Sequence, residues 1–298
     1  MMCNDSPSVA VIIVNYNGFE DTLECVKSIK ECNYDNYTIV LVDNASTDKP
    51  ADDLIKYLKD NTVYIEAQSN DGFSAGNNLG IKWAMEQGNE LCLLINNDTT
   101  VEPDFLNILV DTYKYHTNVG IIGGRICFYS KKDTIWYGGG KLDYIYGGAI
   151  QENYNKAVPI TDEVHKVEFI TGCLMLIPTK VFETIGLLDE SFFLYEEDME
   201  YCLRAAKHGY ELLYADNAVI YHKVSASTQK NSSLKSYYEL RNKFSTTNKY
   251  FPDSKKIHGR IIARYLKDFL RGRRELRPLI MAYWDYKCGV VGKKNKNG

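Results

Sequence analysis

Several broad protein classes are excluded by what the sequence lacks. Its 298 residues contain no run of about 18 apolar residues, which excludes a multi-span membrane protein. With 45% hydrophobic and 25% charged residues, the composition is not that of a disordered chain, a collagen or a coiled coil. The first residues lack both a basic segment and a small-residue cleavage site. We therefore expect them to lead into a first strand rather than to form a signal peptide.

The cysteine spacing lacks the patterns of disulfide frames and zinc sites. None of the eight cysteines forms a C-x-x-C pair, and several lie in apolar runs, as Cys92 and Cys173 do. We therefore expect buried free thiols in a reducing, cytoplasmic environment.

Two common nucleotide-binding motifs are also absent. The first predicted strand is followed by Asn15-Tyr16-Asn17-Gly18, which does not match G-x-G-x-x-G. The glycine-rich segment from Asn70 to Asn77 does not match it either, and it lacks the lysine of a P-loop. Hydride transfer with a dinucleotide and P-loop phosphoryl transfer are therefore disfavoured.

The net charge of −4 conceals an uneven distribution. Between Lys255 and Gly298 there are 13 basic and three acidic residues, whereas the rest of the chain has 22 basic and 36 acidic residues. A basic segment on an acidic body predicts an anionic partner for that segment. This partner can be a membrane surface, a nucleic acid or the acidic body itself.

Buried strands alternate with helical patterns through the first 100 residues. Continuous apolar runs predict strands, and apolar residues at helical spacing predict the helices between them. The expected strands are Val9–Val14, Tyr37–Val42, Thr62–Ala67 and Leu91–Ile95, and the expected helices span 19–31, 51–59 and 77–87. This alternation predicts an α/β fold with a mainly parallel central sheet flanked by helices. The polar clusters follow strand ends, where ligands bind in such sheets.

The remainder of the chain is predicted to be less regular. Strands are expected over 119–126, 167–177 and 210–222, and helices over 197–208, 232–250 and 257–271. We expect a domain boundary near residue 225, so that residues 1–225 form the main domain. Residues 226–298 then form a basic, mostly helical C-terminal extension.

Three polar clusters at predicted strand ends have both a chemical and a structural interpretation. Asp43 can hold a base or a ribose, or it can cap the next helix. Asp98, in the segment Asn96-Asn97-Asp98, can bind Mg²⁺ or Mn²⁺, or the segment can be an ordinary turn. His222 can complete a metal shell or contact a phosphate, or it can be a hydrogen-bonded residue at a strand end.

A fourth cluster consists of three consecutive acidic residues, Glu196-Glu197-Asp198, beside an aromatic run. Clustered carboxylates raise one another's pKa, which suits a general base. The structural alternative is a set of acidic residues that favours the N-terminus of the following helix.

In order along the chain, these segments resemble one family. They are VIIVNYNG, VLVDNASTD, N-x-GFSAGNN-x-G, LLINND, FITGCLMLIP and FFLYEEDMEYCLRAAKHGY, followed by a strand that ends at His222. Over residues 8–225 the chain resembles the family 2 glycosyltransferases, inverting enzymes of the GT-A fold, and within them the bacterial rhamnosyltransferase-like branch. Each motif is weak alone, whereas six in this order are specific.

The resemblance implies a nucleotide-diphosphate sugar bound across the ends of the first four strands. The residues implied to hold it are Val14, Asn15, Tyr16, Asp43, Asn70, Gly76, Asn77, Asn97 and Asp98. Asn97 and Asp98 match the last two positions of the family's D-x-D motif, whose first Asp is replaced by Asn96. We expect Asp98 and His222 to bind Mg²⁺ or Mn²⁺, with an attraction weakened by the loss of one carboxylate.

The resemblance also implies the catalytic machinery. Asp198 matches the family's base, which deprotonates the acceptor hydroxyl, and Glu197 either supports it or is itself the base. Thr171, Gly172 and Cys173 match the segment that lines the sugar and acceptor pocket. A single base suffices because inversion needs no covalent intermediate.

The expected function is therefore transfer of a sugar from dTDP-rhamnose or a UDP-hexose to a hydroxyl of a glycan or lipid-linked acceptor, in bacterial surface polysaccharide synthesis. One alternative is a catalytically inactive GT-A domain that binds a nucleotide sugar or glycan as an assembly partner. Another is a nucleotidyltransferase, against which the lack of basic residues in Asn15–Gly18 argues.

The basic extension has several possible partners. It is expected to contact an anionic membrane at the inner face of the plasma membrane, to pack on the catalytic domain, or to form a homodimer seam. Nucleic acid is disfavoured, because no recognised binding module is present.

Overall fold

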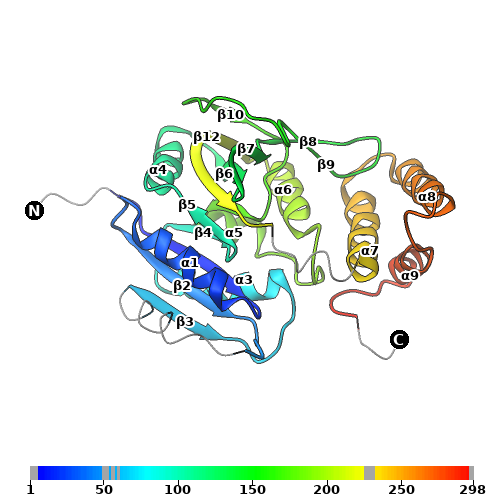
Figure 1. Cartoon of the computed structure of the whole chain (residues 1–298), viewed down its shortest axis with the longest axis horizontal. Coiled ribbons are helices and arrows are strands. Elements are labelled where there is room, and N and C mark those ends of the chain that lie inside the picture. Colours follow the sequence, from blue (N-terminus) through cyan, green and yellow to red (C-terminus); the bar gives the residue numbers. More distant parts are fainter. Residues whose placement is uncertain (1–5, 49–53, 55–57, 59–60, 225–231, 295–298) are drawn as a thin grey trace, which may run out of the picture.

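A large mixed sheet forms the centre of the protein. The computed structural model describes residues 6–48, 54, 58, 61–224 and 232–294. The strands of the sheet run in the order β10-β12-β6-β11-β4-β1-β2-β3, with β5 paired to β12 and β7 paired to β6. Strands β8 and β9 form a separate two-stranded sheet. Figure 1 shows the C-terminal helices to one side of the central sheet, with α6 between them and the strands.

The element bounds are as follows. The strands are β1 (Val9–Asn15), β2 (Tyr37–Asp43), β3 (Thr62–Glu66), β4 (Leu91–Asn96), β5 (Thr99–Val101), β6 (Val119–Phe128), β7 (Lys131–Tyr137), β8 (Gly140–Leu142), β9 (Ala149–Gln151), β10 (Val164–Lys166), β11 (Leu174–Pro178) and β12 (Glu211–His222). The helices are α1 (Phe19–Lys30), α3 (Phe73–Glu86), α4 (Phe105–Tyr115), α5 (Thr179–Ile185), α6 (Glu197–Lys207), α7 (Ser232–Tyr250), α8 (Ser254–Leu270) and α9 (Arg277–Lys287).

The four strands predicted in the first 100 residues are present and parallel. β1 pairs in parallel with both β2 and β4, and β2 pairs in parallel with β3. In this register Asn15 lies opposite Asp43, and Val14 lies opposite Asn96. The sheet therefore brings Asn15 and the clusters of Asp43 and Asp98 to one edge, and the predicted α/β fold is confirmed.

Strands β1, β2 and β4 are buried because helices cover the sheet. Two glycines allow α3 to pack closely on β1: a Cβ added at Gly76 would lie 2.8 Å from Val14 Cγ1, and one at Gly80 would lie 2.5 Å from Ile12 Cγ2. The glycine-rich segment therefore has a packing role on the helix face that touches the sheet.

The C-terminal helices have a hydrophobic cluster of their own. Its buried members are Tyr237, Tyr238, Leu240, Phe244, Phe251, Ile257, Ile261, Tyr265, Leu279 and Ala282. The buried carboxylate of Glu200 on α6 accepts hydrogen bonds from Lys249 Nζ (2.8 Å) and the Tyr250 hydroxyl (2.6 Å) on α7. The C-terminal helices therefore pack on the rest of the protein, which is one of the three arrangements expected from the sequence.

Some details of the sequence prediction are wrong. Of the strand expected over residues 167–177, only the C-terminal part is a strand, β11, which begins at Leu174; residues 167–173 form an irregular segment between β10 and β11. In that segment the Ile170 N–H bonds to Cys202 Sγ (3.3 Å), so the backbone follows α6 rather than the sheet. Helix α3 begins at Phe73, earlier than expected, and α9 was not predicted at all.

Two expectations fall on residues that the structure does not describe. They are the boundary near residue 225 and most of the helix expected over residues 51–59. Among the described residues, none of the helices combines the length and the apolar character needed to cross a bilayer.

Candidate active site

Asn15 connects the ends of three strands at the edge of the sheet. Its amide nitrogen donates to Asp43 Oδ1 (3.2 Å) and to Ser46 Oγ (3.0 Å). Its amide oxygen accepts from Thr22 Oγ1 (3.0 Å) and from Asn97 Nδ2 (3.4 Å). Because Asn15 is fully buried, it fixes the positions of Asp43 and Asn97 from the inside of the edge.

Asp98 and His222 are the second pair that the fold brings together. They are 124 positions apart in the sequence, yet Asp98 Oδ1 lies 3.1 Å from His222 Nε2, and both side chains are buried. The Lys223 N–H donates to the Asp98 carbonyl (2.9 Å), and the ring of Trp136 meets the edge of the imidazole with centroids 4.6 Å apart. Burial lowers the pKa of His222, but Cys173 and the Asp98 carboxylate outweigh it and raise this pKa to about 10.

The Asp98–His222 pair fits a divalent ion that is shared with a diphosphate. Among the described residues no group of three or more His, Cys, Asp and Glu side chains is placed to hold a metal ion. The pair would thus supply only part of a metal shell. Mg²⁺ and Mn²⁺ commonly bind through one or two protein ligands and take their other ligands from water and substrate phosphates. A set of one carboxylate and one imidazole suits Mn²⁺ better than Mg²⁺.

Asp198, at the start of α6, lies on the side of Cys173 that is opposite to the Asp98–His222 pair. Its carboxylate accepts hydrogen bonds from the backbone N–H groups of Gly172 (2.9 Å) and Met199 (2.8 Å). The Cys173 carbonyl in turn accepts from Asn96 N–H (3.1 Å) at the end of β4. The predicted pocket segment Thr171-Gly172-Cys173 therefore connects the predicted metal site with the predicted base.

The three consecutive acidic residues differ in their environments. Burial raises the pKa of Asp198, although its two backbone donors stabilise the charged form. Burial and the neighbouring Asp198 hold the pKa of Glu197 well above its usual range. Burial raises the pKa of Glu196 to about 7, against the opposing charge of Lys243. Glu197 is buried and Asp198 is partly exposed, so Asp198 is the more accessible of the two predicted bases.

Strained backbone precedes these acids. Tyr195 and Glu196 have φ angles of 69° and 72°, in the left-handed region that non-glycine residues seldom adopt. Asn242 on α7 holds this conformation, because its amide donates to the carbonyls of Leu194 and Tyr195, both at 2.9 Å. Helix α7 thereby fixes the backbone just before the predicted base.

The segment after α9 also reaches the active-site loops. The Gly292 N–H donates to the Ser191 carbonyl (2.7 Å), and Arg241 Nη1 donates to the Gly292 carbonyl (2.8 Å). Lys293 Nζ donates to the Asn70 carbonyl (2.8 Å) on the predicted donor side. Residues 289–294 therefore join the catalytic segment to the donor loop.

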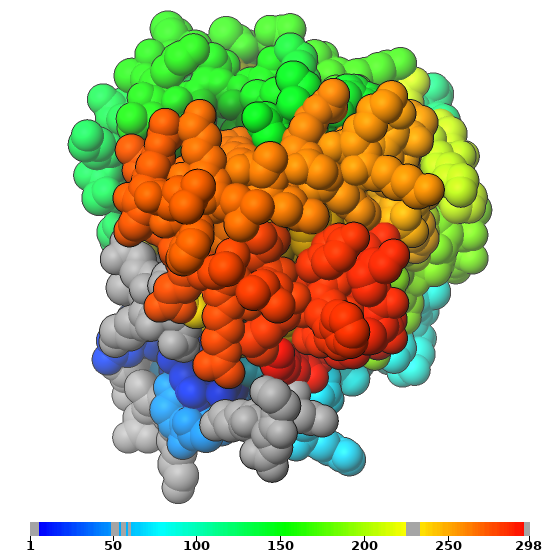
Figure 2. All heavy atoms as spheres, turned by 90° about the vertical axis from the view of Figure 1, so that its right-hand side faces the viewer, coloured from blue at the N-terminus to red at the C-terminus, as the bar shows by residue number. Residues whose placement is uncertain are grey.

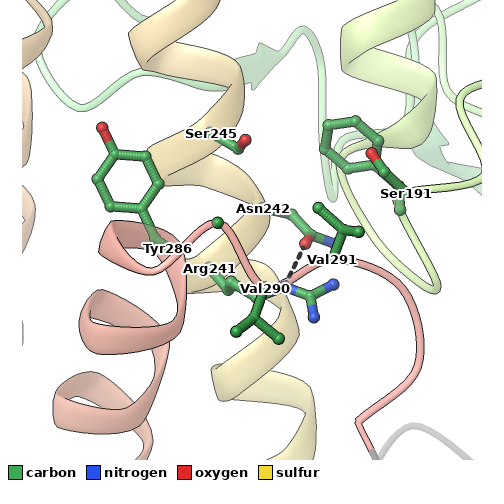
Figure 3. A pocket seen from close by; sticks show the side chains of 9 residues that line it. Ser191, Arg241, Asn242, Ser245, Tyr286, Val290 and Val291 are labelled. Carbon is green, nitrogen blue, oxygen red and sulfur yellow. Dashed lines mark hydrogen bonds between the residues drawn. The ribbon is translucent and has the colours of Figure 1, made fainter.

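A small cavity of about 40 Å³ lies between α7 and the segment that follows α9 (Figure 3). Arg241, Asn242 and Ser245 of α7 line one side, and Val290 and Val291 line the other. One water molecule needs about 10–15 Å³ of such a cavity, so this cavity holds only about three water molecules. The cavity therefore cannot receive a nucleotide sugar.

The other predicted donor residues are less directly placed. Tyr16 is exposed beside Asn15, whereas Val14 packs against Gly76. The buried Asn77 amide donates to the Phe73 carbonyl (2.9 Å) within its own helix. Asn70 Oδ1 accepts from Asn44 Nδ2 (3.2 Å), next to Asp43. The structure thus gives Gly76 and Asn77 packing roles on α3.

Sequence reasoning missed several residues of this region. Thr22, Trp136, Asn242, Lys243 and Lys293 support the site from distant segments. None of them lies in a recognisable motif, and Asn242 and Lys293 come from the extension. Only their contacts in the folded chain identify them.

Gly72 provides a test of the contact between the two loops. Its φ of 102° suits glycine, and a Cβ there would lie 2.1 Å from the Phe193 carbonyl oxygen. We expect Gly72→Ala to displace residues 193–198 and to lower turnover at least tenfold, because displacements of about 1 Å can reduce rates by about 10². Gly88→Ala is the matched control, since Gly88 also has a positive φ (74°) but nothing within 4 Å of an added Cβ.

In the Gly88→Ala protein the left-handed backbone is strained by about 1 kcal/mol, so we expect its melting temperature to fall by a few degrees. We expect its activity to be retained. Turnover and melting temperature of both variants are measured together. Equal turnover in the two variants would show that the Gly72–Phe193 contact does not position the catalytic segment.

Comparison with known proteins identifies the family. The pattern of the family described as Glycosyl transferase family 2 matches residues 10–186. The low-salt glycan biosynthesis hexosyltransferase Agl10 of Haloferax volcanii is 30% identical over 258 residues, which cover 83% of this chain and 77% of the relative. The dTDP-rhamnosyl transferase RfbF of Shigella flexneri is 24% identical, over 80% of this chain and 79% of the relative.

Solved structures show the same fold. A crystal structure of GalNAc-T7 with UDP, GalNAc and Mn²⁺ has a TM-score of 0.69 at 16% identity and covers 96% of this chain, which corresponds to 55% of that longer chain. The mannosyltransferase PcManGT from Pyrobaculum calidifontis, in complex with GDP-Man and Mn²⁺, has a TM-score of 0.60 at 14% identity. The match covers 96% of this chain and 81% of the mannosyltransferase chain. The chain therefore belongs to glycosyl transferase family 2, and it is a glycosyltransferase with the GT-A fold.

Proposed function

We propose that this glycosyltransferase moves a sugar from a nucleotide-diphosphate donor to a hydroxyl group of a glycan or lipid-linked acceptor, with inversion at the anomeric carbon. The observation that carries the proposal is the arrangement around Cys173. A carboxylate–imidazole pair suited to a diphosphate lies on one side of it, and a partly exposed carboxylate lies on the other.

In this proposal the roles of the residues follow from their environments. Asp43 and Tyr16 hold the nucleoside, and Asp98 and His222 hold the metal and the diphosphate. A divalent ion held there by Asp98 and His222 would supply positive charge to offset the negative charge of the leaving diphosphate. Asp198 takes the proton of the acceptor hydroxyl, whose oxygen attacks the anomeric carbon opposite the leaving group.

The names of the relatives support the choice of donor and pathway. One relative is a hexosyltransferase of glycan biosynthesis and another is a dTDP-rhamnosyl transferase. We therefore propose dTDP-rhamnose or a UDP-hexose as donor, and a role in surface polysaccharide synthesis on the cytoplasmic face of the membrane. Residues 1–225 form the catalytic domain in this proposal, and the separate hydrophobic cluster of α7–α9 supports an extension over 226–298.

A thermal-shift panel tests the proposal. Sugars linked to UDP, dTDP and GDP are each added with Mn²⁺, with Mg²⁺ or with EDTA. We expect one nucleotide class to raise the melting temperature, since a ligand at 100 times its Kd stabilises the folded state by about 2.7 kcal/mol. EDTA should abolish the shift. The absence of a shift with every donor, with or without metal, would contradict the donor site.

A further inference from the structure

One side of the C-terminal helices remains uncovered. Helices α8 and α9 bury Ile257, Ile261 and Leu279 against α7, while their opposite sides face outward. Figure 2 views the molecule from this side, where the two helices form one continuous face. A surface with a packed inner side and a free outer side is available to a partner.

The outer side carries large apolar residues. Leu270 is 82% exposed, Ile280 is 59% exposed and Trp284 is 69% exposed. Ile280, Tyr283 and Trp284 are spaced at i, i+3 and i+4, so they share one side of α9. Contiguous exposed apolar residues of this kind mark interaction sites.

Basic residues are numerous on the same two helices and on the connection between them. Between Lys255 and Lys287 there are ten Lys and Arg residues, and all of them are exposed. The acidic residues of α8 and α9 already have partners. Asp268 forms an ion pair with Arg274 (3.8 Å). Asp285 forms an ion pair with Lys294 (3.5 Å) and accepts a hydrogen bond from the Tyr237 hydroxyl (2.7 Å). The face therefore presents a positive field that complements an anionic surface.

A cavity opens at the connection between α8 and α9. Its volume is about 290 Å³, and it is lined by Ser233, Ser236, Tyr265, Gly272, Arg273, Arg274, Glu275 and Pro278. The Glu275 carboxylate accepts a hydrogen bond from the Ser233 hydroxyl (2.6 Å). Arg273 and Arg274 give the cavity the donors that a phosphate diester needs.

We infer that the outer face of α8 and α9 docks on an anionic phospholipid bilayer. Leu270, Ile280 and Trp284 insert at the level of the headgroups, where tryptophan is favoured. The cavity at Arg273 receives a lipid phosphate. The biological purpose rests on the proposed function, because docking brings the active site to a lipid-linked acceptor, whereas the binding itself does not depend on turnover.

Co-sedimentation with vesicles tests this inference on the full chain. Truncation is unsuitable, because residues 289–294 contact the catalytic segment. We expect binding to vesicles of phosphatidylcholine with phosphatidylglycerol and not to phosphatidylcholine alone, with loss of binding at high salt. Arg271→Gln with Arg273→Gln should weaken binding about fivefold per charge removed, and Trp284→Ser about tenfold.

Matched controls separate this face from the general surface. Lys131→Gln with Lys207→Gln removes the same charge elsewhere, and Tyr115→Ser removes an aromatic that is 80% exposed on α4. These variants should bind like the wild type. Equal binding by all variants, or equal binding to both vesicle types, would overturn the inference. So would a dimer that Trp284→Ser dissociates without any change in vesicle binding. Donor-induced thermal shifts, measured in parallel, report separately on the proposed function.

Discussion

Replacing Asp198 by asparagine is expected to lower turnover by about 10³-fold while leaving donor affinity within a factor of about two. General base catalysis contributes about 10²–10⁴-fold, and the amide cannot accept the acceptor's proton. Asparagine keeps the size of the side chain and can still accept the N–H donors of Gly172 and Met199 through its oxygen. The measurements are kcat with saturating substrates and donor Kd by titration calorimetry.

The pH profile should change together with the rate. The base acts only when it is deprotonated, so turnover should fall as the pH decreases through the pKa of Asp198. Burial raises this pKa above the 3.8 of an ordinary aspartate, so the acidic limb should lie at a correspondingly higher pH. In the Asp198→Asn enzyme this limb should disappear from the residual activity.

Glu197→Gln is the comparison that distinguishes the two candidate bases. Burial and the neighbouring Asp198 hold the pKa of Glu197 well above its usual range, which favours the protonated form, and glutamine is a close substitute for that form. We expect its turnover to stay within a few-fold of the wild type. A large loss in Glu197→Gln together with normal turnover in Asp198→Asn would assign the base to Glu197 instead.

Replacing Asp98 by asparagine should remove metal-dependent donor binding and lower turnover by about 10²–10³-fold. The Asp98 carboxylate is the only negatively charged side chain of the Asp98–His222 pair. Removing a group that stabilises the charge of the transition state lowers turnover by an amount of this size. The readout is the calorimetric Kd of the preferred nucleotide diphosphate, measured with Mn²⁺ and with EDTA. In the wild type Mn²⁺ should tighten this Kd, and in Asp98→Asn the two values should coincide.

The control for this variant is Asp111→Asn, which removes the charge of an exposed aspartate on α4. It should behave like the wild type in both titrations. Melting temperatures without ligand show whether the loss of the Asp98–His222 contact has also weakened the fold. If the wild type binds the diphosphate equally well in EDTA, the metal assignment is wrong, and the imidazolium of His222 becomes the phosphate-binding group.

Much of the fold and part of the site follow from local sequence patterns. The runs at Val9–Val14, Tyr37–Val42 and Leu91–Ile95 predict buried parallel strands, because a strand covered on both faces has apolar residues at every position. Parallel strands place their C-terminal ends at one edge, so the polar residues after them, including Asp43 and Asp98, are expected to meet there. The sequence alone determined this much, since both arguments use only neighbouring residues and the geometry of a sheet.

Only the tertiary structure decided how the distant segments meet. The 3.1 Å contact between Asp98 and His222 depends on the antiparallel pairing of β5 with β12, which no local pattern encodes. The left-handed backbone at Tyr195 and Glu196 is stabilised by Asn242 on α7, a helix that lies outside the family motifs. The expected strand over 167–177 breaks because its backbone bonds to Cys202 on α6. Such features depend on long-range contacts that override local propensity, and they become visible only when the chain is folded.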